Sequence, residues 1–336
     1  MIGTFVAQDM VLFFVFFGIT EDSFLMWNGS IEFVLTDKVI VLMLALAFLV
    51  PLTTETFDLS IGANLALGLL IVNKFAEQTD LPNGVGGIVG SMLAYWMTEL
   101  GQKNIVGLEK STVIPSDIAS TAHASDFVYN TTHDKLSNWT TAFSRNFYEE
   151  NGFFLKKGGL EICRKDDDAR WEELKRKVES GKSFGTNVRL ISAAEAKEKF
   201  PLLDEESIRG AMWDPDAGLV VPRSQDVVSF AVESAKEKGA LTTFADTPAI
   251  GFEIEKGRVI GVKTNKGIIK AEKVVIASGI WGPLIGEMAG VPVPLSPVEH
   301  PLLFFGPLPQ AQGTEDFLVY PLLRDQGNSA YVRDTG

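Results

Sequence analysis

The stretch "NGVGGIVGSMLAYWMTELGQKNIVGLEKS", residues 83–111, fits either a nucleotide-binding turn that opens a helix or a glycine-containing membrane helix. The 18 positions from Leu81 to Thr98 carry no charged side chain, which suits a membrane span. A dinucleotide-binding turn instead needs glycines for a tight bend, for close approach of the pyrophosphate and for packing of the helix on the strand. Gly86, Gly87 and Gly90 supply these glycines.

The residues after the predicted helix separate the two interpretations. The apolar spacing of "SMLAYWMTELG" predicts a helix that ends at Gly101, and "KNIVGLEKS" then predicts a short strand that ends in an acid. Glu109 lies 19 positions after Gly90, near the roughly 20-residue offset at which an acid binds the adenosine ribose. A membrane helix gives no reason for this strand and acid, so the pattern favours dinucleotide binding.

Composition bounds the class of protein. A chain of 336 residues with 46% hydrophobic side chains can form one large or two modest domains. The formal net charge of -13 argues against a nucleic-acid partner, because neutralising phosphates needs clustered Lys and Arg. The single cysteine, Cys163, excludes an internal disulfide, and with three histidines we expect no structural metal site. A reducing compartment fits this composition.

The first 80 residues are much more apolar than the rest. Their apolar runs, 11–19, 39–52 and 59–72, each fall short of the roughly 18 to 20 residues of a clean membrane span. Three such runs in succession are unusual in a soluble domain, so we favour membrane association over buried core helices. We expect the protein at the cytoplasmic face of a membrane, attached through residues 1–73. Within this segment, "VPLTTETFDLSIGANLALG" resembles the "DLSVG…LAL" segment of sugar-type ABC transporter permeases, over about Val39 to Val72.

The second half of the chain has the pattern of an α/β protein. "KGRVIGVKTNKGIIKAEKVVIASGIWG" predicts a hairpin of Arg258 to Thr264 and Ile268 to Ala271, followed by a buried strand, Val274 to Ala277. That strand leads into "SGIWG", a second place where a ligand can approach the backbone closely. "GFFLKKGGLEICR", residues 152–164, also predicts a hairpin, and "DDDARWEELKRKVES" predicts an amphipathic helix.

These motifs together resemble a known family, the FAD-dependent amine oxidoreductases of the D-amino-acid-oxidase superfamily, nearest to the dimethylglycine and sarcosine dehydrogenase branch. The resemblance runs from about Val85 to Gly336. It rests on "GGIVG", "IVGLEKS", "STAHAS", "SFGTNVRLISAAEAKEKFPLL", "DPDAGLVVPRS", "GRVIGVKTNKGIIKAEKVVIASGIWG" and "MAGVPVPLSPVEH", in this order. The order of the motifs is specific, although none of them alone is.

The resemblance implies an α/β fold, with a Rossmann-like FAD-binding domain and an α+β substrate domain behind the apolar N-terminal helical segment. The expected domains are residues 1–80 for the apolar segment, 81–150 with 223–290 for FAD binding, and 151–222 with 291–336 for the substrate.

The resemblance also implies functional residues. In this branch the histidine of the "STAHAS" run carries the flavin covalently, which makes His123 the candidate attachment site, and a local loop histidine is the alternative. His300 in "SPVEH" is the candidate catalytic residue for proton handling, with a core or rim histidine as the alternative. The residues expected at the cofactor are Gly86, Gly87, Gly90, Glu109, Lys110, Ser120, Thr121, His123, Ala249, Ser278, Gly279 and Trp281.

The implied activity is oxidation of a secondary or tertiary amine of the N-methylglycine type, with hydride transfer to FAD and an unidentified electron acceptor. Two alternatives stay open. One is a membrane transport permease fragment without flavin, in which Leu81 to Thr98 is one more span. The other is an inactive flavoprotein remnant.

The sequence departs from the family pattern at both ends of the matching region. Val85 stands where the first glycine of the family's GxGxxG falls, and the preceding "AEQTDLPN" is too polar for the usual first strand. The family also continues past the place where this chain stops. We therefore expect a permease-like piece fused to a truncated amine oxidoreductase with weakened flavin binding. Leu302, where the family often has an aromatic residue, leaves the substrate open.

Overall fold

The computed structural model describes residues 82–130, 134–298, 301–311 and 318–334. The chain separates into two compact units, residues 1–58 and 59–336, and every described residue belongs to the second. The permease-like segment and the expected membrane attachment through residues 1–73 lie outside the described residues. No helix in the described part has the length and apolar character needed to cross a membrane.

The glycine stretch forms a strand, a turn and a helix. Strand β1 (Pro82–Gly84) pairs in parallel with β2 (Ile105–Leu108), which pairs in parallel with β9 (Leu241–Phe244). Between β1 and β2 lies helix α5 (Ile88–Glu99). This strand-turn-helix order confirms the dinucleotide-type interpretation and shows that a single membrane helix over Leu81 to Thr98 was wrong.

The described part of the first strand comprises 3 residues. It includes Pro82, which has no N–H to donate. Val85, which stands at the family's first glycine position, is fully buried and packs against Gly107 of the neighbouring strand β2. A Cβ on Gly107 would lie 2.5 Å from Val85 Cγ2, too close for any side chain there. A glycine on β2 thus leaves the space that Val85 fills.

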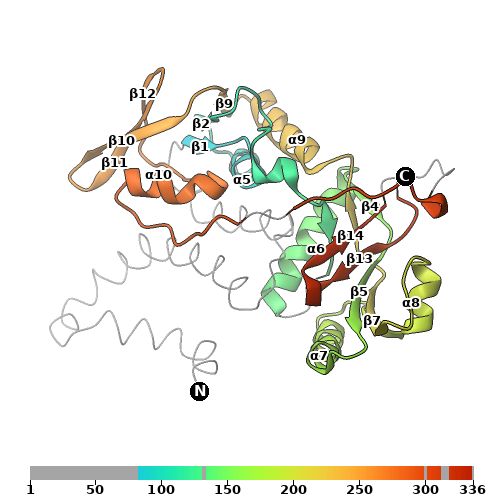
Figure 1. Ribbon diagram of the computed structural model, residues 1–336. Coiled ribbons are helices and arrows are strands. Elements are labelled where there is room, and N and C mark those ends of the chain that lie inside the picture. The colour runs from blue at the N-terminus through green and yellow to red at the C-terminus, as the bar shows by residue number, and fades with distance from the viewer. Residues whose placement is uncertain (1–81, 131–133, 299–300, 312–317, 335–336) are drawn as a thin grey trace, which may run out of the picture. The chain divides into compact units, whose positions relative to one another are not determined.

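The predicted hairpin of Arg258 to Thr264 and Ile268 to Ala271 is confirmed. Strands β10 (Ala249–Glu255), β11 (Arg258–Thr264) and β12 (Gly267–Lys270) form an antiparallel sheet, and α10 (Gly282–Met288) contacts β10 (Figure 1). The predicted strand Val274 to Ala277 is wrong, since the structure has no strand at these half-buried residues. A strand needs a pairing partner, and these residues pair with none of the described strands.

The remaining strands form two sheets. One has five strands in the order β14-β13-β5-β7-β6 and the other three in the order β3-β8-β4. The bounds are β3 (Phe127–Val128), α6 (Lys135–Glu150), β4 (Phe154–Lys156), β5 (Gly159–Arg164), α7 (Asp168–Ser183), β6 (Arg189–Ser192), α8 (Ala193–Lys199), β7 (Ile208–Asp214), β8 (Gly218–Val220), α9 (Ser224–Glu237), β13 (Leu322–Asp325) and β14 (Ala330–Val332). Short 3-10 turns are η3 (Ser120–His123), η4 (Gly279–Trp281), η5 (Pro309–Ala311) and η6 (Gln326–Asn328). The expected domain boundaries stay a prediction.

The predicted hairpin over residues 152–164 is wrong, although both of its strands exist. Strand β4 pairs with β8, whereas β5 pairs with β7 and β13. Gly158 between them has φ +84, and a Cβ on Gly159 would lie 2.3 Å from the Tyr129 ring. The chain therefore passes from one sheet to the other at this point instead of folding back on itself.

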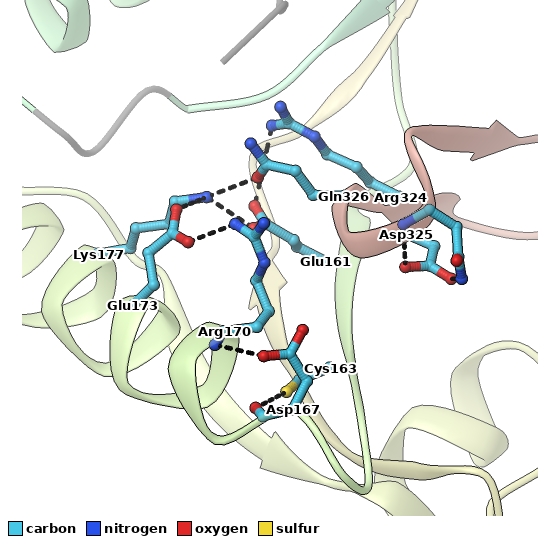
Figure 2. A network of polar contacts seen from close by, with 10 residues as sticks. Glu161, Cys163, Asp167, Arg170, Glu173, Lys177, Arg324, Asp325 and Gln326 are labelled. Atoms are coloured by element: carbon cyan, nitrogen blue, oxygen red, sulfur yellow. Dashed lines mark hydrogen bonds and ion pairs between the residues drawn. The ribbon is translucent and has the colours of Figure 1, made fainter. Parts of the chain in front are cut away.

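A buried network of charges joins α7 to the five-stranded sheet (Figure 2). Lys177 of α7 donates to Glu161 of β5 at 2.6 Å and to Gln326 at 2.9 Å, and it pairs with Glu173 at 3.2 Å. Arg324 of β13 lies 3.8 Å from the other Glu161 oxygen. Glu161 is 1% exposed and Lys177 is 3% exposed. Burial alone would raise the pKa of Glu161, but Lys177 and Arg324 together hold that pKa below its ordinary value.

We expect Lys177→Met to lower the free energy of unfolding by about 3 kcal/mol or more, because it leaves a buried carboxylate without its main partner. Urea unfolding followed by fluorescence measures the change. Lys175→Met is the matched control on the same helix, since Lys175 pairs with Glu172 at 2.6 Å with both side chains about half exposed; it should cost about 0–1 kcal/mol. Equal costs for the two variants would contradict the assignment of Glu161 and Lys177 as a stabilising pair.

The lowered pKa of Glu161 also sets the sign of a pH effect. A carboxyl whose pKa is lower in the folded state stabilises the fold above its unfolded pKa, and loses that contribution as the pH falls through the folded value. The stability difference between the wild type and Lys177→Met should therefore be largest near neutral pH and shrink as the pH falls toward and below about 4.3, the ordinary glutamate value. Urea unfolding of both proteins over a pH series measures this. A difference that stays constant down to strong acid would contradict it.

Candidate cofactor site

The carboxylate of Glu109 lies against the glycine turn between β1 and α5. A Cβ on Gly86 would stand 1.8 Å from Glu109 Oε2 and 2.7 Å from the Cβ of Ser116. Real Cβ atoms do not approach other atoms so closely, so only glycine leaves room for the carboxylate here. The acid that the sequence linked by spacing to Gly90 is thus in direct contact with Gly86 of the same glycine turn.

Two serines fix the orientation of this carboxylate. Glu109 Oε1 accepts hydrogen bonds from the Ser111 backbone N–H at 2.8 Å and from Ser116 Oγ at 3.1 Å. The Ser116 N–H in turn donates to the Gly86 carbonyl at 2.9 Å. Glu109 Oε2 accepts no hydrogen bond from any described residue. The half-buried carboxylate is therefore held by one oxygen and has the other available for a hydroxyl donor.

The N-terminus of α5 is capped from a distant loop. Its N-cap residue, Gly87, has no capping side chain, and the first helical N–H, that of Ile88, donates to Thr121 Oγ1 at 3.1 Å. Thr121 is buried, whereas its neighbour Ser120 is exposed. Gly90, two residues into the helix from Ile88, is buried. Gly86, Gly87, Glu109 and Thr121 are thus brought together around one helix N-terminus, where the helix dipole favours negative charge.

A second group of predicted residues meets beside this cluster. The Lys110 ammonium lies over the Trp281 ring, 4.4 Å from its centroid, and so joins the turn after β2 to η4. Ser278, just before η4, has a buried Oγ without a hydrogen-bond partner in the described chain. Gly279 has φ +53, a backbone conformation that favours glycine. Ala249 opens β10, two residues after Thr247, whose N–H donates to the Glu109 carbonyl at 2.8 Å.

Two predicted residues are not joined to this group. His123 ends η3, is exposed and makes no side-chain hydrogen bond to any described residue. His300 lies outside the described residues, so its catalytic role stays a prediction.

Sequence reasoning missed three residues that hold the site together. Ser111 and Ser116 orient Glu109, and their nearness to the acid in the chain was the available signal. Arg223 donates from Nη2 to the carbonyls of Ala122 and Ala124, about 100 positions earlier in the chain. No local pattern predicts a contact at such a separation.

Comparison with known families identifies the fold that carries this site. Residues 86–336 match the model of the DAO family, described as FAD dependent oxidoreductase. The chain belongs to this FAD-dependent oxidoreductase family. It is related to the sarcosine and dimethylglycine dehydrogenases, and the cofactor of the family is FAD.

Individual relatives agree with this assignment. Mitochondrial sarcosine dehydrogenase of Homo sapiens is 27% identical over 264 residues, which cover 75% of this chain and 27% of the relative. Mitochondrial dimethylglycine dehydrogenase of Rattus norvegicus is 25% identical over 252 residues, covering 74% of this chain and 29% of the relative. The solved structure of L-proline dehydrogenase from P. horikoshii superposes with a TM-score of 0.62 at 29% identity and covers 77% of this chain and 67% of that one. The chain thus spans little more than a quarter of the length of these two curated relatives.

The residues present fit FAD. The Gly86 turn holds the Glu109 carboxylate beside the N-terminus of α5, and the buried Ser278 hydroxyl has no hydrogen-bond partner among the described residues. Glu109 offers one carboxylate oxygen where the family pattern places the ribose hydroxyls. Glu109, the glycine turn and Thr121 would hold the ADP half of FAD. Ser278 and Trp281 would line the second place where the cofactor comes close to the backbone, at η4.

We expect Gly86→Ala to lower the melting temperature of the cofactor-free protein by several degrees, because the added methyl group displaces the Glu109 carboxylate at a cost of about 1–3 kcal/mol. Gly87→Ala is the matched control, since its Cβ would lie 3.4 Å from Thr121 Oγ1, close to ordinary contact. Scanning fluorimetry compares the two variants. A shift for Gly86→Ala no larger than that for Gly87→Ala would contradict the close packing of Glu109 on the turn.

Proposed function

We propose that the protein oxidises a secondary or tertiary amine of the N-methylglycine type with FAD as the hydride acceptor. The observation that carries the proposal is the cluster in which the Glu109 carboxylate, the Gly86 turn and Thr121 surround the N-terminus of α5. A carboxylate and a helix N-terminus at a glycine turn suit the ribose and the pyrophosphate of the ADP half of FAD, which supports the proposal. The substrate class comes from the relatives, which are named for sarcosine and dimethylglycine. Since the chain spans a small part of those relatives, their substrates are proposals here.

Bound FAD would take up a hydride from the carbon next to the amine nitrogen, leaving an iminium that water hydrolyses to an aldehyde and the dealkylated amine. The residues of this chain hold and orient the cofactor. Glu109 Oε2 would accept from a ribose hydroxyl, while Ser111 and Ser116 keep the carboxylate in place through Oε1. Deprotonation of the amine before hydride transfer is assigned to His300, whose role stays a prediction from the resemblance.

His123 is proposed as the covalent attachment site of the flavin. Its imidazole is exposed at the end of η3, two residues after Thr121, so no folded structure has to open for it to reach a bound cofactor. The attachment would replace the imidazole N–H bond and one C–H bond at the 8α-carbon by a C–N bond. The two protons and two electrons released would pass to dioxygen, giving hydrogen peroxide.

An absorption spectrum of the purified protein after addition of FAD, taken before and after acid precipitation, tests the proposal. We expect a flavin band that stays with the precipitate in the wild type and is released to the supernatant in His123→Ala. Sarcosine or dimethylglycine should then bleach the band in the absence of oxygen and reduce an added dye. No flavin band in the wild type would contradict FAD binding. A band that neither amine bleaches would contradict the substrate class and favour a flavoprotein remnant.

The proposed membrane attachment through residues 1–73 is independent of this chemistry. It rests on the three apolar runs alone. Partition of the full chain into detergent would support it, and recovery from a detergent-free supernatant would argue against it.

A further inference from the structure

The loop that carries His123 caps two helices that lack caps of their own. Neither α5 nor α9 has a capping side chain at its N-cap residue. The loop supplies both caps: Thr121 Oγ1 accepts from the first N–H of α5, that of Ile88, and Asp126 Oδ1 accepts from the first N–H of α9, that of Ser224, at 3.1 Å in each case. His123 lies between these two anchors.

The second anchor is rigid. Asp126 is 1% exposed and has φ 65. Its carboxylate also accepts from the hydroxyl of Ser224, which is fully buried, and its carbonyl accepts from the Val220 N–H at 2.8 Å. A carboxylate held at a helix N-terminus is further stabilised by the helix dipole.

Arg223 connects this anchor to the backbone on both sides of His123. Its Nε lies 2.7 Å from Asp126 Oδ2. Its Nη2 donates to the Ala122 carbonyl at 3.2 Å and to the Ala124 carbonyl at 3.4 Å. Since Ala122 and Ala124 flank His123, one guanidinium group fixes the peptide groups from which the imidazole projects.

Inside the loop little else fixes the position of His123. Element η3 has only 4 residues, and its last backbone bond, from the Ala124 N–H to the Thr121 carbonyl, is 3.3 Å long. The His123 side chain has no hydrogen-bond partner among the described residues. The position of the imidazole is therefore set by the backbone at residue 123, and that backbone is held by the hydrogen bonds from Arg223.

We infer that Arg223 is a positioning residue, which fixes the loop around His123 through the Ala122 and Ala124 carbonyls and thereby sets where the imidazole meets the flavin. This inference rests on the proposed function, because it assigns Arg223 a part in the attachment at His123. A reactive group must be held to within about 0.5 Å of its productive position, and residues that fix the backbone are one way to achieve this.

The first test uses the cofactor-free chain. We expect Arg223→Gln to speed hydrogen exchange at the backbone amides of residues 120–125 by about tenfold or more, since a charged group that makes three polar contacts is lost. Arg189→Gln is the matched control, because Arg189 is similarly exposed and pairs with Glu195 in another part of the fold. Exchange in residues 120–125 as slow in Arg223→Gln as in Arg189→Gln would overturn the inference.

The second test measures the attachment. After incubation with FAD, the fraction of bound flavin that stays with the acid precipitate should fall at least severalfold in Arg223→Ala, and guanidinium ion at millimolar concentration should restore it, whereas equal sodium chloride should not. A purely structural role would lower total flavin and the acid-stable part together, without rescue. An acid-stable fraction equal to that of the wild type would overturn the inference.

The wild type separates this inference from the proposed function. If the wild type binds flavin that acid releases completely, the attachment at His123 and the role of Arg223 in it are both overturned, while FAD binding stands. If the amines bleach the band but Arg223→Ala attaches flavin normally, only the inference fails.

Discussion

The space left by one missing side chain at Gly86 determines how the cofactor half of the molecule is assembled. The Glu109 carboxylate occupies the place where any Cβ would stand. Because the carboxylate is also held by Ser111 and Ser116, the turn after β1 and the loop after β2 form one unit. The Glu109 carbonyl accepts from the Thr247 N–H, which connects the segment after β9 to the same unit. The ends of three parallel strands therefore meet at one residue, Glu109, through its carboxylate and its backbone carbonyl.

The two halves of the described chain use charge in different ways. In the five-stranded sheet, Glu161 is almost fully buried and pairs with both Lys177 and Arg324. These ion pairs hold α7 on β5 and β13. Glu109 is half-buried, has no cationic partner among the described ion pairs and keeps one oxygen available. A charge that is completely paired in the interior stabilises a fold, whereas one that is half satisfied at the edge of a sheet can bind a ligand.

The sequence predicted what depends on local spacing. The glycine turn, α5, the acid after β2 and the hairpin of β11 and β12 are set by residues close in the chain, and the structure confirms them.

Predictions failed where the pairing of a strand or a side chain depends on residues far away in the sequence. Residues 274–277 have strand-forming side chains but form no strand, since a strand needs a pairing partner and they pair with none of the described strands. The strands β4 and β5 follow one another in the chain, yet each pairs with a partner more than 40 positions away. The amphipathic pattern of α7 does not show that Lys177 is buried, because its ion pair is with Glu161 on another element.

The contacts that assemble the loop around His123 have the same long-range character. The "STAHAS" motif places a threonine and a histidine near each other, but the motif does not show that the threonine caps α5 or that Asp126 caps α9. The helices α5 and α9 contact each other, so a loop tied to both N-termini is held by a rigid pair. A 3-10 turn of 4 residues has too few backbone bonds to hold a side chain in place by itself. The position of His123 is therefore a property of two packed helices and the arginine that precedes one of them. Motif matching alone would assign the histidine and overlook the residues on which its position depends.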